Sequence, residues 1–188
     1  MEIDCVDKKE LLIPTIYSDE ILVEIKNLKL TFDNTKKLYS INYKKNQIKK
    51  INTKFKKLFS FLPPKISNFE INKNALVFWV RPNSYFVLGQ FDRKSFYKNS
   101  QNVFSITDQT GGWICFNLNG KNNKLLFEKL LNIDLFAFVE KQVIRTSINE
   151  INCFVLCHNQ FENYTIICPT SFSESMKSRL LDLIKLIE

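Results

Sequence analysis

The stretch that decides the fold is Val103-Phe-Ser-Ile-Thr-Asp-Gln-Thr-Gly-Gly-Trp113, which continues as Ile114-Cys-Phe-Asn-Leu-Asn-Gly120. It opens with a short apolar run, and the Ser, Thr, Asp, Gln and Gly residues after that run predict a polar turn. The second apolar run ends at a glycine, where a helical pattern begins. The stretch is therefore expected to form a strand, a turn and a second strand, followed directly by a helix.

The residues after this stretch indicate a helix, a strand, a hairpin and a closing helix. Apolar residues form one stripe over 121–131, as in an amphipathic helix. A strand is expected at 143–148, and a hairpin with strands at 151–157 and 164–168. The closing helix is expected to start at a capping box, Ser171-Phe-Ser-Glu174, with the first serine as the N-cap residue.

The residues before the stretch have a similar order. Residues 21–32 alternate in hydrophobicity, which predicts one or two short strands. Apolar residues at helical spacing predict a helix over 48–62, and a proline pair ends it. A hairpin follows, with strands at 75–80 and 85–88, and a short helix is expected at 92–98.

The two halves of the chain thus share the order strand, helix, hairpin, helix. This order predicts an α+β fold in which antiparallel sheets are covered by helices. We expect an N-terminal arm at residues 1–20, a basic first half at 21–100 and a second half at 101–188, packed as one compact unit. Because the strands are apolar at nearly every position, both of their faces should be covered. With few helices available, an apolar patch is expected to be left for a partner.

Lysine is concentrated in the first half, and the formal net charge of the chain is +8. The stretch from Lys26 to Lys65 contains a single acidic residue, Asp33, against the lysines Lys26, Lys29, Lys36, Lys37, Lys44, Lys45, Lys49, Lys50, Lys54, Lys56, Lys57 and Lys65. Segment 36–57 is open to three interpretations: a surface for nucleic acid or a polyglutamylated cofactor, a solvated face, or a surface that docks an acidic partner. Arginine, which suits bidentate phosphate recognition, is sparse, and this disfavours nucleic acid.

The sequence carries no signal for a membrane or for secretion. No apolar run approaches the ~20 residues that span a bilayer, and the N-terminus lacks the apolar core of a signal peptide. The cysteines number five, which is odd and therefore untypical of a disulfide framework. A cytoplasmic protein with free cysteines is expected.

The pattern Cys153-Phe-Val-Leu-Cys-His158 invites a metal interpretation, but its geometry is unfavourable. It lies in an expected strand, where four residues span about 13 Å at ~3.3 Å per residue. Two thiolates on one zinc ion must lie within about 4 Å of each other, because Zn–S bonds are about 2.3 Å long. Cys153 and Cys157 are thus expected to belong to the core, and no metal site is predicted.

No set of residues predicts catalysis within this chain. His158 is the only histidine, and with only four glycines a dinucleotide- or phosphate-binding loop is almost excluded. A cysteine beside His158 in a strand would point to the opposite face. Asp108 is a candidate general base, although a cap on the backbone N–H groups of its own turn is favoured. Thr110-Gly-Gly-Trp113 is a candidate anion cradle, although a turn that admits a strand to a sheet is favoured. No catalytic, cofactor-binding or metal-binding residue is therefore predicted.

The stretch from Val103 closely resembles one known family, the gamma subunit of heterotetrameric sarcosine oxidase. In that family a Ser-Val-Thr-Asp-Gln-Ser-x-x-Trp run leads into a strand that ends in Leu-Ser-Gly. Further likenesses are found at Leu76-Val-Phe-Trp-Val-Arg-Pro-Asn-Ser-Tyr-Phe-Val-Leu88, Ile133-Asp-Leu135 and Cys168-Pro-Thr-Ser-Phe-Ser-Glu-Ser175. The likeness runs, with gaps, from about Leu22 to the C-terminus.

This family resembles the folate-binding module of the aminomethyltransferases, and the resemblance implies that fold. It also implies an enzyme complex that oxidatively demethylates sarcosine to glycine, with tetrahydrofolate as the one-carbon acceptor and oxygen reduced to hydrogen peroxide. FAD, FMN, NAD and tetrahydrofolate are expected in the alpha, beta and delta partner subunits. No cofactor is expected in this chain, which would be a non-catalytic accessory subunit. Two alternatives stay open: the equivalent subunit of an N-methylglutamate dehydrogenase, and a stand-alone folate- or polyanion-binding module.

Overall fold

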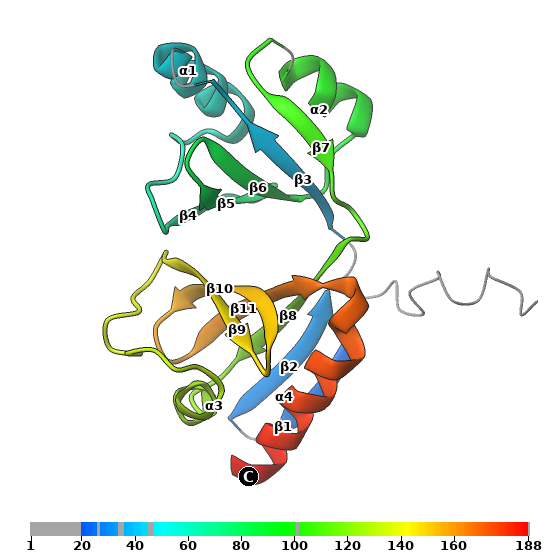
Figure 1. Cartoon of the computed structure of the whole chain (residues 1–188), viewed down its shortest axis with the longest axis vertical. Helices are drawn as coiled ribbons and strands as arrows, with labels where there is room; N and C mark the ends of the chain where they lie inside the picture. Colours follow the sequence, from blue (N-terminus) through cyan, green and yellow to red (C-terminus); the bar gives the residue numbers. More distant parts are fainter. Residues whose placement is uncertain (1–19, 26, 34–35, 45–46, 101, 188) are drawn as a thin grey trace, which may run out of the picture.

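The computed structural model describes residues 20–25, 27–33, 36–44, 47–100 and 102–187 (Figure 1). The arm expected at residues 1–20 lies outside this part of the chain, apart from Glu20. The described residues form two antiparallel sheets and four α-helices, so the predicted α+β class is confirmed. Within these ranges, no helix has the length and apolar character needed to cross a membrane.

The first sheet has six strands in the order β1-β2-β8-β11-β10-β9, and all neighbours are antiparallel. Its strands are β1 (Glu20–Ile25), β2 (Leu28–Asp33), β8 (Trp113–Asn119), β9 (Val143–Ile148), β10 (Ile151–Asn159) and β11 (Asn163–Pro169). The helices that pack on it are α3 (Asn123–Leu130) and α4 (Ser173–Ile187).

The second sheet has five strands in the order β4-β5-β6-β3-β7, again antiparallel throughout. Its strands are β3 (Lys37–Asn42), β4 (Phe69–Ile71), β5 (Ala75–Arg81), β6 (Ser84–Gly89) and β7 (Ser105–Asp108). The helices that pack on it are α1 (Ile48–Phe59) and α2 (Arg93–Ser100).

The two sheets repeat one chain order and exchange a strand. The order β3-α1-β4-β5-β6-α2 recurs as β8-α3-β9-β10-β11-α4. β7, which directly precedes β8 in the chain, pairs with β3, whereas β2, which precedes β3, pairs with β8. The sheets are therefore interleaved in sequence. The two sheets do not coincide with the two expected halves, because β2 lies in the six-stranded sheet and β7 in the five-stranded sheet. The division of the chain at residue 100 stays a prediction.

Helices cover the outer face of each sheet, and the inner faces of the sheets pack against each other (Figure 1). Phe55 of α1 and Phe96 of α2 belong to the core on the five-stranded sheet. Phe127 of α3 and Leu180 of α4 belong to the core on the six-stranded sheet. A third cluster, which includes Phe154, joins the two sheets. The order of layers is helices, sheet, sheet, helices.

This arrangement explains why the strands are apolar at nearly every position. Val155 and Cys157 of β10 lie in the core beneath α3 and α4, whereas Phe154 and Leu156 lie between the sheets. The second face of each sheet is thus covered by the other sheet. The apolar patch was expected because the helices were too few to cover both faces of the strands. The other sheet of the same chain supplies the second cover.

The predicted elements differ from the structure mainly at three places. The closing helix begins with a 3₁₀ turn at Thr170–Phe172 that has Pro169 as its N-cap residue, so the predicted N-cap at Ser171 is wrong. β3 was not predicted, because it lies in the lysine-rich segment. β4 was not predicted either, because its three residues are too few to show a period.

Candidate functional site

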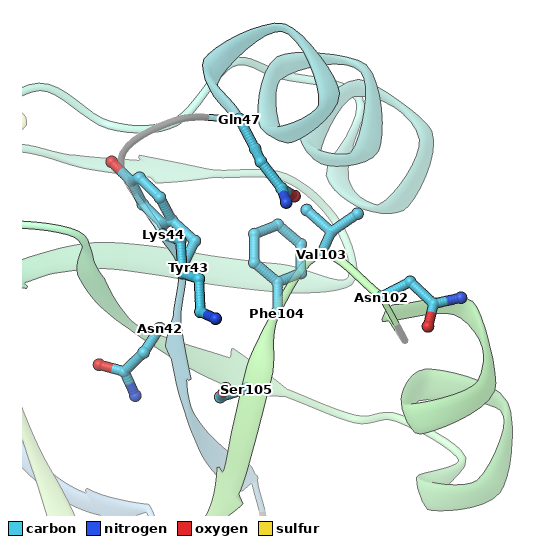
Figure 2. Close-up of a pocket in the computed structure, with 8 residues that line it drawn as sticks. All are labelled: Asn42, Tyr43, Lys44, Gln47, Asn102, Val103, Phe104 and Ser105. Carbon is cyan, nitrogen blue, oxygen red and sulfur yellow. The ribbon is translucent and has the colours of Figure 1, made fainter.

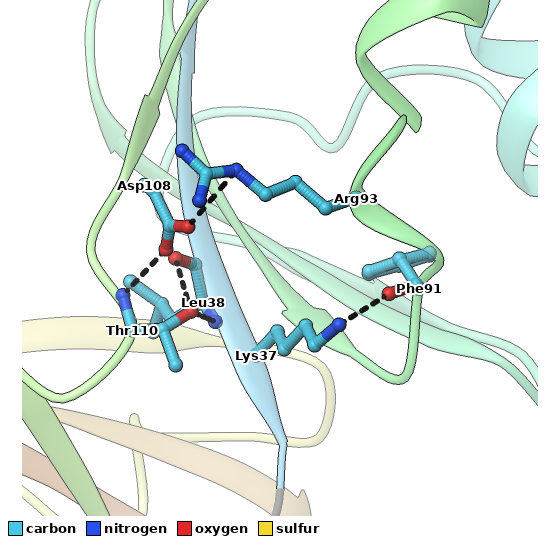
Figure 3. A network of polar contacts seen from close by, with 6 residues as sticks. All are labelled: Lys37, Leu38, Phe91, Arg93, Asp108 and Thr110. Carbon is cyan, nitrogen blue, oxygen red and sulfur yellow. Dashed lines mark hydrogen bonds and ion pairs between the residues drawn. The ribbon is translucent and has the colours of Figure 1, made fainter. Parts of the chain in front are cut away.

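The decisive stretch forms β7, a turn and β8, and the turn, residues 109–112, links the two sheets (Figure 3). The Gln109 N–H donates to the Leu38 carbonyl over 2.8 Å, and the Leu38 N–H donates to the Thr110 hydroxyl over 3.1 Å. Asp108 stabilises the same turn: its Oδ1 accepts the Thr110 N–H over 3.0 Å, and its Oδ2 lies 3.8 Å from Arg93 Nε. The carboxylate therefore makes the Asx-type cap that its turn predicts.

The glycine pair of this link uses its backbone groups within the chain. The Gly112 N–H donates to the Gln109 carbonyl over 3.0 Å. The carbonyls of Gly112 and Gly111 accept the N–H and the hydroxyl of Thr170 over 3.0 Å and 2.7 Å. Gly111 has φ +82°, a conformation that favours glycine. The geometry fits a turn that ties the link to the six-stranded sheet, because a backbone N–H that an anion would need already has an acceptor.

The cysteines near His158 are separated from it by the strand itself. Cys153 and Cys157 are buried on the face of β10 that α3 and α4 cover. Burial raises the pKa of the Cys153 thiol to about 12 and that of Cys157 to about 11, so both are protonated at neutral pH. His158 lines the space on the other face. In the described ranges, no three His, Cys, Asp or Glu residues are grouped to hold a metal ion.

The lysines of the basic segment lie in different surroundings. Those on the outer surface of α1 are exposed: Lys49, Lys50, Lys56 and Lys57. Lys36 forms an ion pair with the buried carboxylate of Asp33. The Lys37 ammonium donates to the Phe91 carbonyl over 2.9 Å (Figure 3). Lys26 and Lys45 lie outside the described residues.

A surface pocket of about 430 Å³ lies between the end of β3, the start of α1 and the segment that leads into β7 (Figure 2). Its lining residues are Asn42, Tyr43, Lys44, Gln47, Asn102, Val103, Phe104 and Ser105. Phe104 is buried and packs edge-to-face on Phe55, with 5.5 Å between ring centroids. Lys44 supplies the charge of this lining, which contains no acid to pair with it as an acid–base couple.

A larger cavity, of about 760 Å³, lies between the two sheets. We call it the intersheet cavity. Its wall on the six-stranded sheet is polar and includes Asn117, Thr165 and His158. Its wall on the five-stranded sheet includes the apolar side chains of Leu76 and Leu88. The volume lies within the range of sites for small organic molecules.

Three polar side chains of the intersheet cavity form a hydrogen-bonded chain. The Thr165 hydroxyl donates to Asn117 Oδ1 over 2.8 Å and lies 3.0 Å from His158 Nε2. Because the hydroxyl hydrogen is already used, Thr165 accepts the Nε2–H of His158. Burial, and the positive charge of Lys36, lower the pKa of His158, so its ring is neutral at neutral pH. The Phe69 ring packs on the imidazole with 4.9 Å between centroids.

Asn117 and Thr165 are candidate site residues that the sequence patterns alone did not reveal. Each lies in a strand between apolar neighbours, so the sequence patterns marked it only as part of a strand. The available signal was the period-two alternation in β8, where Cys115, Asn117 and Asn119 share one face. Polar residues on an inner-facing row indicate a cavity only once the opposing sheet is known.

No family model matches the sequence, and no curated protein matches it. Among solved structures, the chain is similar to a chain of the heterotetrameric sarcosine oxidase from Corynebacterium sp. U-96 in complex with pyrrole 2-carboxylate. That match has a TM-score of 0.74 and 14% identity, and covers 89% of this chain and 88% of that chain. A second match is the glycine cleavage system aminomethyltransferase T from Bartonella henselae, with a TM-score of 0.58 and 9% identity, covering 82% of this chain and 45% of that chain. At these identities the matches show the fold alone, which this chain shares with the sarcosine oxidase chain and with part of the aminomethyltransferase chain.

Proposed function

We propose that this chain is a small accessory subunit, of the gamma type, in a heterotetrameric sarcosine oxidase. The observation that carries the proposal is the extent of the fold likeness, which spans 89% of this chain and 88% of the sarcosine oxidase chain. The two chains are therefore of nearly equal length. The sequence resemblance to the gamma subunit family, which is best from Ser105 onward, supports the same assignment.

In this proposal the role of the chain is structural. The side chains that could act in catalysis have structural contacts instead: Asp108 caps its own turn, and His158 is hydrogen-bonded to Thr165. The described cysteines, Cys115, Cys153, Cys157 and Cys168, are all buried, and burial raises each thiol pKa. These surroundings favour a subunit that keeps the large subunits in register.

The proposed complex oxidises the N-methyl group of sarcosine and releases glycine. The one-carbon unit passes to tetrahydrofolate, and oxygen accepts two electrons and two protons to become hydrogen peroxide. We place FAD, FMN, NAD and tetrahydrofolate in the alpha, beta and delta subunits, and none in this chain. The chain has only four glycines, too few for a dinucleotide- or phosphate-binding loop of the usual kind, which supports that division.

The test of the structural role uses the isolated chain. Purified alone, it should carry no flavin absorbance in the visible range and should not oxidise sarcosine. Stoichiometric bound flavin, or amine oxidation that follows the chain through purification, would overturn the proposal. The co-expressed complex serves as the positive control, since its large subunits should supply both properties.

A related candidate is the equivalent subunit of an N-methylglutamate dehydrogenase. The fold supports it equally, because a structural subunit carries no substrate contacts of its own. The assembled complex separates the two candidates: sarcosine turnover with hydrogen peroxide release supports the first, and N-methylglutamate turnover supports the second.

A stand-alone folate- or polyanion-binding module is the remaining candidate. It is favoured by the fold likeness to aminomethyltransferase T and by the exposed lysines of α1. Titration of the isolated chain with tetrahydrofolate polyglutamate and with single-stranded nucleic acid tests it. If neither binds at low micromolar concentration in physiological salt, this candidate is eliminated.

A further inference from the structure

The inner face of the six-stranded sheet changes character along its strands. Toward the β7–β8 link it is apolar, with Ile167 and Phe154 packed against the other sheet. Further along the strands it is polar: the cross-strand register places Thr31 beside Asn117, and Asn117 beside Thr165. All three polar residues line the intersheet cavity. The cavity therefore lies where the polar row replaces the apolar packing.

The polar row is held in one arrangement by its own hydrogen bonds. Thr165 is only 6% exposed, and its hydroxyl joins Asn117 to His158. Burial of polar groups costs free energy unless they are paired, and these atoms are paired within the protein. The amide nitrogen Nδ2 of Asn117 carries two N–H donors, and it donates no hydrogen bond to any of the described residues. These donors are available to a molecule in the cavity.

The opposite wall carries two apolar side chains, Leu76 of β5 and Leu88 of β6, beside polar residues of the β4–β5 turn. Its shape is preformed. At the rim, the β4–β5 turn is held by Asn72, whose Oδ1 accepts the Asn74 N–H over 2.8 Å. Gly89 permits the close approach of this turn, since a Cβ there would lie 2.3 Å from the Asn74 carbonyl oxygen. The wall is therefore shaped without a ligand, which lowers the free-energy cost of binding.

The charges at the cavity are largely balanced. Asp33 and Lys36 line it as an ion pair. His158 is neutral because burial lowers its pKa. Lys73, in the β4–β5 turn, is exposed to solvent, where a charge is screened. Recognition in this cavity thus depends on hydrogen bonds and apolar contact more than on net charge.

We propose that the intersheet cavity binds a small neutral organic molecule that carries a carbonyl or carboxamide group on an apolar body. The carbonyl oxygen accepts an N–H of Asn117, and the apolar body lies against Leu76 and Leu88. The proposal is carried by the cavity alone, so it holds for the chain by itself as well as for the chain in a complex.

Three probes of one size and one apolar ring test the proposal: benzamide, benzoate and benzylamine. Each is titrated into the full-length ¹⁵N-labelled chain, and side-chain amide and imidazole shifts are followed by NMR. Benzamide should shift the Asn117 amide and the ring of His158, the only histidine, and should bind about tenfold more tightly than benzylamine. Equal binding of all three probes, or benzamide shifts confined to other residues, would overturn the proposal.

A matched pair of variants locates the site. Thr165→Val removes the hydroxyl that orients Asn117, and should weaken benzamide binding about tenfold. Thr146→Val makes the same change on β9 of the same sheet, outside the cavity lining, and should leave binding unchanged. Equal affinity in the two variants would contradict the assigned site. The comparison of benzamide with benzylamine on the unaltered chain needs no variant to fold, so it decides the proposal even if Thr165→Val is unstable.

Discussion

Asp108 stands in the decisive stretch at the position where the sequence allowed either catalysis or turn formation. The structure gives its two carboxylate oxygens separate contacts, one with the Thr110 N–H at 3.0 Å and one near Arg93 Nε at 3.8 Å. The Asp108 side chain is 29% exposed, so the ion pair should contribute about 0–1 kcal/mol. The backbone hydrogen bond is then the more important contact for stability.

Two substitutions at Asp108 separate these contacts. Asp108→Asn keeps an oxygen that accepts the Thr110 N–H, and should change the free energy of unfolding by less than about 1 kcal/mol. Asp108→Ala removes the acceptor and should cost about 1–2 kcal/mol. Urea unfolding of both variants measures the difference. If Asp108→Asn instead assembles normally and loses turnover of the complex, the residue is catalytic and the structural interpretation is wrong.

The lowered pKa of His158 predicts that the stability of the fold decreases as the pH is lowered. Burial, aided by the positive charge of Lys36, lowers its folded-state pKa below the ordinary value of 6.5. Just below pH 6.5 the unfolded chain therefore binds more protons than the folded chain, so stability falls as the pH drops through this window. Above the window the contribution is fully present. Urea midpoints from about pH 7.5 to 5 should fall less in His158→Gln than in the unaltered chain. Parallel slopes would contradict this prediction.

At the scale of the element, the ends of β8 depend on two glycines in different ways. Gly120, at the end of β8, has φ +129°, and a Cβ there would lie 2.2 Å from the Asn27 carbonyl oxygen. Gly111, just before β8, has φ +82°, but no atom would lie within 4 Å of its Cβ. The same substitution at both positions thus separates steric crowding from backbone strain.

Gly111→Ala should cost about 1–2 kcal/mol, the cost of a left-handed conformation for a residue with a Cβ. Gly120→Ala should cost more than about 3 kcal/mol, because backbone atoms must also move. Thermal unfolding of the two variants, compared with the unaltered chain, measures both. A smaller loss at Gly120 than at Gly111 would show that the close approach to Asn27 is not a constraint.

Elements with a strong period of their own were predictable from the sequence. The helix expected over 48–62 is α1, and the strand expected over 143–148 is β9 with the same bounds. The sheet that each strand joins was not predictable, because a period of two assigns faces and not neighbours. The exchange of β2 and β7 between the sheets, and with it the intersheet cavity, depends on those neighbours. Asn117 and Thr165 could therefore be placed on a strand but not in a site.

At the scale of the whole molecule, the two sheets share one core. Phe154 of the six-stranded sheet lies 5.3 Å from Phe78 and 5.8 Å from Phe86 of the five-stranded sheet, between ring centroids. Trp113, at the start of β8, lies 5.7 Å from the same ring. Because these contacts are buried and cross the gap between the sheets, the sheets should unfold together.

Phe154→Ala should lower the free energy of unfolding by about 3–5 kcal/mol, the range for a buried phenylalanine. Its unfolding should remain one transition when followed by tryptophan fluorescence and by far-ultraviolet circular dichroism. Phe136→Ala is the control, since Phe136 is 66% exposed and should lose about 1 kcal/mol or less. Two separate transitions in the unaltered chain would contradict the shared core.

The central claim, that the chain is a structural subunit, is tested most directly by native mass spectrometry of the co-expressed complex. The chain is produced together with the large subunits encoded by its neighbouring genes, and the mass of the assembly is measured alongside sarcosine turnover. We predict that the chain is retained in a fixed ratio to the large subunits, and that an assembly made without it is incomplete and less active. A chain that purifies apart from large subunits that assemble and turn over sarcosine fully without it would contradict the claim.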